Sequence, residues 1–162
     1  MDDVFKGAGG RAGLKRAGYQ GGIQCPMVVR WPGKIKPGTE TDLLSAHYDF
    51  MATLADLGGT DIPSGKDSVS YLPTLLGEKQ KQVHDFIFVR NKNRFMGRSA
   101  LITRDGWKLI RVGENDFQLY HIKEDNEERY NLAAKYPERV ERLKQLFFRE
   151  LDSERPDLTA TE

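Results

Sequence analysis

Lys15 is the residue whose type and position best suit anion binding. It stands just before three closely spaced glycines, Gly18, Gly21 and Gly22. Glycines allow positive φ or a close backbone approach, so this turn can present a nearby side chain at the end of a strand. An ammonium group there can neutralise charge on a transferring anion, and its contribution grows where water is excluded. The alternative is a solvated loop lysine, which composition alone favours.

The histidines and the single cysteine supply few other candidates for chemistry. His47, His84 and His121 are scattered, and their spacing forms neither a metal-ligand pattern nor a base beside a nucleophile. We interpret them as surface or packing residues, but His47 stands near a predicted helix start and is kept as a candidate for substrate binding. Cys25 is interpreted as a small buried apolar residue, and as the only cysteine it excludes an internal disulfide bond.

The composition is balanced and excludes several classes of partner. The 162 residues can bury a core as one domain, or as a domain with an appendage. Charged residues make up 30% and the net charge is +1, so nothing predicts nucleic-acid binding or a charged membrane surface. No apolar run reaches the roughly 18 residues of a membrane span. The first three residues are acidic, where a signal peptide is basic.

In the first half of the chain, the pattern predicts a loop, a strand and a helix. Residues 1–24 are rich in glycine and are predicted to be a loop, mobile on its own. The apolar run between two prolines predicts a buried strand over 27–31, at the edge of a covered sheet of the α/β class. Asp49 is predicted to cap a helix that ends at Gly58-Gly59. The predicted buried stripe of this helix consists of Phe50, Met51, Leu54 and Leu57.

The second half of the chain has the pattern of an α+β unit. The predicted strands are 86–90, 99–103, 107–112 and 117–122. Asp105-Gly106 between two of them is a strong hairpin signal. A helix starting at Pro137 is predicted to cover one face of the resulting antiparallel sheet. Its apolar side consists of Val140, Leu143, Leu146, Phe147 and Leu151. The loop 91–98 is predicted to be a solvated connection, with ligand contact as the alternative.

The glycine-rich segment resembles a motif of the formylglycine-dependent sulfatases. That motif reads Lys-x-x-x-Tyr-Glu-Gly-Gly-x-Arg-x-Pro, followed by an apolar strand and Trp-Pro-Gly-x-Ile. The matching residues here are Lys15, Tyr19, Gly21, Gly22, Pro26, Trp31, Pro32, Gly33 and Ile35. The departures are Gln20 in place of the usual glutamate and Gln24-Cys25 in place of Arg-Val.

Three later segments are similar to the same family, in the same order along the chain. Residues 67–77 resemble its Asp-Gly-x-Ser-Leu-Leu-Pro-Leu-Leu-x-Gly segment, with Ser68 in place of glycine. Residues 104–111 resemble its Gly-Asp-Trp-Lys-Leu-Ile strand. Residues 119–132 resemble its Leu-Tyr-Asp-Leu-x-x-Asp-Pro-x-Glu-x-x-Asn-Leu signature, with Asn126 in place of proline. Glycine accepts positive φ more readily than serine, so the turn at Ser68 is predicted to be either reshaped or strained.

The resemblance implies a domain organisation. Residues 1–78 would be the end of an alkaline-phosphatase-like α/β catalytic domain. Residues 79–155 would form a C-terminal subdomain, with a four-stranded antiparallel sheet packed by a helix, and residues 156–162 a tail.

The resemblance also implies an activity and its cofactors. The chain would be the C-terminal portion of a sulfuric ester hydrolase, in which Lys15 contacts the sulfate of a sulfated small molecule or glycan. The formylglycine, formed within Cys-x-Pro-Ser-Arg, and the Ca²⁺ site would belong to a missing N-terminal part. Cys25 lacks the Ser-Arg that this modification needs. The chain alone is therefore expected to hold no cofactor and to be inactive. Members of the family are periplasmic, secreted or lysosomal.

Two other functions stay open from the sequence. One is a phosphonate or phosphate ester hydrolase of the alkaline phosphatase superfamily, which a different nucleophile would distinguish. The other is a non-catalytic module that binds carbohydrate or protein. An isolated chain would also leave the strand over 27–31 uncovered, so we expect self-association through exposed apolar surface.

Overall fold

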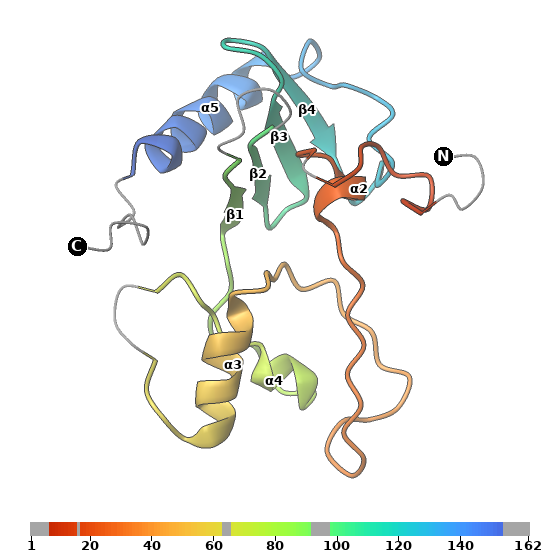
Figure 1. Cartoon of the computed structure of the whole chain (residues 1–162), viewed down its shortest axis with the longest axis vertical. Helices are drawn as coiled ribbons and strands as arrows, with labels where there is room; N and C mark the ends of the chain where they lie inside the picture. Colours follow the sequence, from red (N-terminus) through yellow and green to blue (C-terminus); the bar gives the residue numbers. More distant parts are fainter. Residues whose placement is uncertain (1–6, 16, 63–65, 92–97, 154–162) are drawn as a thin grey trace. The chain divides into compact units, whose positions relative to one another are not determined.

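The computed structural model describes residues 7–15, 17–62, 66–91 and 98–153 (Figure 1). The contacts of the chain group these residues into two compact units. One contains the residues up to Gln24 together with those from Phe88 onward, and the other runs from Cys25 to Ile87. The domain boundary predicted at residue 78 stays a prediction, and the sequence did not suggest a division near residue 24. The tail 156–162 and most of the loop 91–98 lie outside the described residues.

The chain forms a four-stranded sheet, as predicted, and all of it except Phe86 and Ile87 belongs to the first unit. Its strands are β1 (Phe86–Val89), β2 (Ala100–Thr103), β3 (Trp107–Arg111) and β4 (Phe117–His121), in the order β1-β2-β3-β4. β3 pairs antiparallel with both β2 and β4. The predicted hairpin between β2 and β3 is confirmed, because the Gly106 amide donates to the Thr103 carbonyl at 2.9 Å and Gly106 has φ 94°.

One face of this sheet is covered by α5 (Pro137–Asp152), which lies beside the strands in Figure 1 and runs at an angle to them. Leu109 and Leu119 are register partners with no exposed surface, and Leu143 and Phe147 of α5 are also buried. The Phe147 ring packs edge-on against Phe117 of β4, with centroids 5.4 Å apart. The predicted helix and its buried stripe are therefore confirmed at the centre of the helix.

The opposite face of the sheet is covered by the glycine-rich segment 7–24, which was predicted to be a mobile loop. Side chains alternate along a strand, so Lys108 and Ile110 point away from the face that Leu109 occupies. Ile110 forms a buried cluster with Ala100 and Tyr120, and Tyr19 packs against this cluster. The described part of the segment is mostly loop, as predicted, apart from the short helix over Gln20–Ile23. The polar anchors that fix it to the sheet were not predicted.

The second unit contains α3 (Asp49–Gly58) and α4 (Leu72–Leu75). The helix was correctly predicted, and it ends at Gly59 in the left-handed conformation with φ 65°. The predicted N-cap, Asp49, is wrong. The N-cap residue is Tyr48, and the Asp49 carboxylate accepts hydrogen bonds from the amides of Ala46 and Val69. Ser68 does not have positive φ; its Oγ accepts from the Ala52 amide at 2.9 Å and donates to the Tyr48 carbonyl at 2.6 Å.

Three predictions of burial in this unit were wrong. The segment 27–31 is not a strand, and its Val28 is 94% exposed. In the described part of the chain no strand pairs with it, and Met27 and Val29 are also exposed. Cys25 is likewise exposed. The residues predicted as the buried stripe of α3, which are Phe50, Met51, Leu54 and Leu57, are all at least 40% exposed.

No helix among the residues described is long and apolar enough to cross a membrane.

Candidate functional site

The glycine-rich turn that carries Lys15 is held by close backbone packing. A Cβ atom on Gly21 would lie 2.3 Å from the Gly13 carbonyl oxygen, and one on Gly18 would lie 2.5 Å from that of Arg98. The Gly21 amide also donates to the Ala12 carbonyl at 2.8 Å. Neither Gly18 nor Gly21 has positive φ, so these glycines are needed because the backbone approaches so closely.

Tyr19 anchors this turn to the sheet through its hydroxyl group. The hydroxyl donates to Gln118 Oε1 on β4 at 2.5 Å and accepts from Arg98 Nη1 at 2.6 Å. Its ring meets Tyr120 edge-on, with centroids 6.3 Å apart, and the Arg98 guanidinium lies 5.1 Å from the centre of the same ring. Tyr19 is thus fixed from both its polar and its apolar side.

Gln20, the first residue of α2 (Gln20–Ile23), is the second anchor. Its backbone amide donates to Glu128 Oε2 at 2.6 Å, and its side-chain Oε1 accepts from Lys108 Nζ on β3 at 3.1 Å. Its Nε2 donates to Asn126 Oδ1 at 3.2 Å. Gln20 is itself buried, so these hydrogen bonds form away from water.

Lys108 and Glu128 form a buried ion pair beneath the turn. Lys108 Nζ lies 2.7 Å from Glu128 Oε1, and both side chains have no exposed surface. Burial lowers the pKa of Lys108 to about 8, although the attraction of Glu128 opposes the shift. Burial likewise raises the pKa of Glu128, against the opposing effects of Lys108 and of the Gln20 amide. The fold therefore holds two charges where desolvation disfavours both.

The predicted site residues Lys15 and His47 are both exposed. Lys15 lies on the turn just described, while His47 directly precedes Tyr48, the N-cap residue of α3. The two belong to different units of the chain. Their predicted roles in binding sulfate and substrate stay predictions.

His84, interpreted as a surface or packing histidine, forms a buried pair with Asp49. Its Nε2 lies 2.9 and 3.0 Å from the two Asp49 carboxylate oxygens. Asp49 also accepts from the backbone amides of Ala46 and Val69, at 2.7 and 2.9 Å. All its partners lie on segments beside α3, so the pair ties the second unit together.

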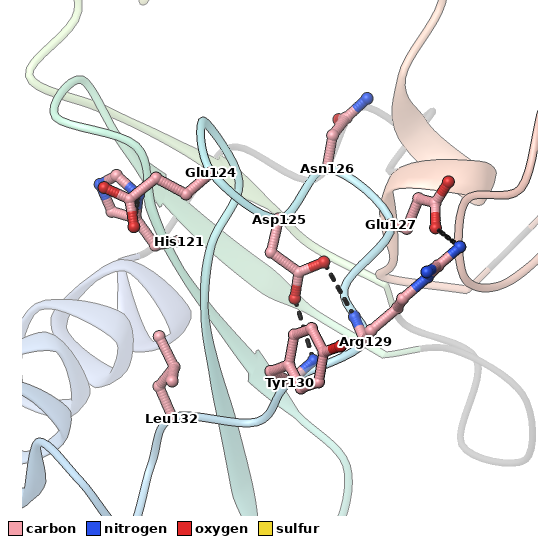
Figure 2. Close-up of a pocket in the computed structure, with 8 residues that line it drawn as sticks. All are labelled: His121, Glu124, Asp125, Asn126, Glu127, Arg129, Tyr130 and Leu132. Atoms are coloured by element: carbon pink, nitrogen blue, oxygen red, sulfur yellow. Dashed lines mark hydrogen bonds and ion pairs between the residues drawn. The ribbon is translucent and has the colours of Figure 1, made fainter.

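A surface pocket of about 570 Å³ lies over the loop that follows β4 (Figure 2). The Asp125 carboxylate points inward there and accepts from the backbone amides of Arg129 and Tyr130, at 3.1 and 2.9 Å. The Arg129 guanidinium pairs with Glu127. These polar groups already satisfy one another, so they shape the loop. Neither Lys15 nor His47 lines this pocket.

No residue set in the described ranges suits a metal ion. No three side chains of histidine, cysteine, aspartate or glutamate gather closely enough there to hold one. Ca²⁺ takes about six or more oxygen ligands. The residues present therefore do not fit the Ca²⁺ that the family resemblance implies.

The sequence reasoning missed Lys108 and Glu128, although both stand within segments that it singled out. The sequence did carry a signal for this pair, because Lys108 lies inside a predicted strand, two residues before the apolar Ile110. Alternation along the strand puts that lysine on the same face as Ile110. A charged residue there needs a buried partner.

Comparison with known proteins agrees with the sheet, the helix and the glycine-rich turn. The family model described as N-sulphoglucosamine sulphohydrolase, C-terminal, matches residues 13–155. An N-acetylgalactosamine-6-O-sulfatase of Bacteroides thetaiotaomicron is 32% identical over 83% of this chain and 28% of its own length. The steryl-sulfatase of Rattus norvegicus is 38% identical over 49% of this chain and 15% of its own length.

The solved structures show the same fold. One, from work on the metabolism of multiple glycosaminoglycans by Bacteroides thetaiotaomicron, superposes with a TM-score of 0.73 and 29% identity. The match covers 88% of this chain and 32% of that one. A phosphonate monoester hydrolase from Silicibacter pomeroyi, at 22% identity and a TM-score of 0.54, matches over 75% of this chain and 27% of its own and shows the fold alone.

The sheet, the helix and the turn thus have the fold of the solved structures that the chain matches. The chain belongs to the sulfatase family and corresponds to its C-terminal part. It spans between 15% and 33% of the length of the first curated relatives that it matches.

Proposed function

We propose that this chain is the C-terminal part of an enzyme that hydrolyses sulfate esters, and that Lys15 contacts the sulfate group. One observation carries the proposal. Lys15 is exposed, while the turn that bears it is fixed to the sheet through Tyr19 and Gln20. A cation held on a rigid turn can meet an anion without the cost of ordering the backbone at that moment.

In the proposed complete enzyme, this chain contributes the sulfate contact and other residues contribute the nucleophile and the metal ligands. Lys15 supplies positive charge to the sulfate oxygens, and water exclusion strengthens this attraction. The nucleophile and the Ca²⁺ ligands would lie outside this sequence. The isolated chain is therefore expected to bind a sulfated ligand weakly and to turn over none.

The substrate class proposed is a sulfated glycan. The relative that aligns over 83% of the chain is named for a sulfated amino sugar, whereas the steryl-sulfatase aligns over only 49%. His47, exposed beside α3, is proposed as a further substrate contact.

Titration of this chain with N-acetylgalactosamine 6-sulfate tests the contact. We expect Lys15→Ala to weaken binding tenfold or more, because one charge-assisted contact contributes about 1.5–3 kcal/mol and about 1.4 kcal/mol is a factor of ten. Lys34→Ala removes an exposed lysine from a surface turn elsewhere and should leave the Kd unchanged. Equal Kd values for Lys15→Ala and the wild-type chain would exclude the proposed role. His47→Ala in the same titration tests the second contact.

A further inference from the structure

We propose that Lys108, Glu128 and Gln20 form a positioning unit that sets the place of the glycine-rich turn and thereby of Lys15. The inference rests on the proposed function of Lys15 and assigns to the C-terminal sheet a part in that function. Lys108, Glu128 and Gln20 are positioning residues, since none of them is exposed to a ligand.

The contacts converge on the first residue of α2. Glu128 Oε2 accepts the backbone amide of Gln20 at 2.6 Å, and Lys108 Nζ donates to its side-chain oxygen at 3.1 Å. The three residues come from β3, from the loop after β4 and from the glycine-rich turn. A backbone atom and a side-chain atom of one residue are thus held by a single ion pair, which fixes both the position and the orientation of the turn.

The ion pair is hard to explain by stability alone. Two charges without exposed surface lose their hydration, and apolar residues of similar volume are often as stable at such a position. In addition, Glu128 has φ 56°, a left-handed conformation that non-glycine residues adopt at a cost. Both features are explained if the position of the Glu128 carboxylate matters more than the stability that it contributes.

The loop after β4 is built to hold Glu128 in that conformation. The Glu128 amide donates to the Asp125 carbonyl at 3.1 Å. The Asp125 carboxylate in turn accepts the amides of Arg129 and Tyr130, a contact drawn in Figure 2. These bonds fix the backbone on both sides of Glu128. The pocket loop therefore supports the positioning unit.

The charge of the unit is balanced because residue 20 is a glutamine. Its amide brings no charge, so one ammonium faces one carboxylate. The side chain nevertheless uses both its acceptor and its donor, on Lys108 and on Asn126. Gln20 can therefore be truncated without leaving a buried charge unpaired. Its truncation tests how the turn is held while the Lys108–Glu128 pair stays intact.

Residue-resolved amide hydrogen exchange on this chain tests the inference. In the double variant Lys108→Met with Glu128→Met, both charges are removed together, so no charge is left unpaired. We expect the protection of the Gln20 amide to fall at least tenfold while the amides of β3 keep theirs. The control is Glu141→Gln with Lys144→Met, which removes a more exposed ion pair on α5 and should change neither.

Binding of N-acetylgalactosamine 6-sulfate by the same variants supplies the second measurement. The Met/Met variant should bind about tenfold more weakly, because Lys15 is no longer held in place. Lys15→Ala should weaken binding while the Gln20 amide stays protected. If Lys15→Ala leaves the affinity unchanged, the proposed function fails, while the exchange data still decide whether the ion pair positions the turn.

Two results overturn the inference. One is Gln20 protection within about twofold of the wild-type value in the Met/Met variant. The other, where Lys15→Ala does weaken binding, is lost protection with unchanged affinity. If that variant does not fold, Gln20→Ala decides the question. Its Gly21 and Gly22 amides should then exchange at least about threefold faster, and unchanged exchange there would reject the positioning unit.

Discussion

Lys108 Nζ lies 2.7 Å from Glu128 Oε1, and neither side chain has exposed surface. This relationship links β3 and the loop after β4 to the turn that carries Lys15. Both charges of the ion pair are buried away from water. The contribution of each side chain to the free energy of unfolding therefore depends strongly on whether the other is present.

Removing one member of this ion pair should be far more harmful than removing both. Lys108→Met or Glu128→Met alone leaves a buried unpaired charge and should lower the free energy of unfolding by about 3–5 kcal/mol. The double variant should lie within about 1 kcal/mol of the wild-type chain. Urea denaturation of the wild-type chain, the two single variants and the double variant gives the interaction free energy of the pair as a double-mutant cycle. Additive single effects would show that the two side chains do not act as a pair.

The second unit should lose stability in acid because of Asp49. Burial raises the pKa of this carboxyl group, but hydrogen bonds from His84 and from the amides of Val69 and Ala46 outweigh burial and hold it below 3.8. The folded state therefore favours the carboxylate. Its stabilising effect is fully present above pH 3.8 and is lost as the pH falls through the folded pKa.

Asp49→Asn should abolish this dependence on pH and lower the free energy of unfolding at pH 7 by about 1–3 kcal/mol. Asp61→Asn, at an exposed position, serves as the control. Thermal denaturation between pH 2 and pH 7 measures both variants. An unchanged acid slope in Asp49→Asn would contradict the assignment.

Gly21 is predicted to be intolerant of any side chain. An added Cβ would lie 2.3 Å from the Gly13 carbonyl oxygen and 2.6 Å from that of Ala12, so Gly21→Ala must push the turn apart. We expect a loss of about 1–3 kcal/mol in stability. Gly58→Ala is the matched control, because no atom beyond its chain neighbours and its own helix backbone lies within 4 Å of its added Cβ, and it should be neutral or slightly stabilising. Equal effects of the two substitutions would argue against the close packing.

The apolar side of α3 predicts self-association of the isolated chain. Leu54 and Leu57 are 61% and 49% exposed on this short helix. Sedimentation velocity of the wild-type chain at about 100 μM should show species larger than the monomer, and Leu54→Glu should shift the population toward the monomer. A single monomeric species in the wild-type chain would reject this prediction.

Much of the first unit could be predicted because its signals are local. Alternating apolar residues, the Asp105-Gly106 turn and Pro137 at a helix start specify the strands, one hairpin and α5 without reference to the rest of the chain. Their bounds agree with the structure to within a residue or two.

The parts that were missed depend on distant residues. Local spacing cannot reveal that Gln20 meets Lys108 and Glu128, since those contacts join residues far apart in the sequence. Burial of Val28 was predicted from apolar character alone, but burial also needs a covering element, and the described chain offers none.

The contact between Lys15 and the sulfate is tested most directly in a chimeric enzyme. In this chimera, the Bacteroides thetaiotaomicron N-acetylgalactosamine-6-O-sulfatase carries this chain in place of its own matching segment. The kcat/KM for release of sulfate from N-acetylgalactosamine 6-sulfate is compared between this chimera and its Lys15→Ala variant, with Lys34→Ala as control. We predict a loss of about 10²–10³-fold for Lys15→Ala and an unchanged value for the control. A Lys15→Ala chimera within about threefold of its parent would contradict the claim that this lysine contacts the sulfate.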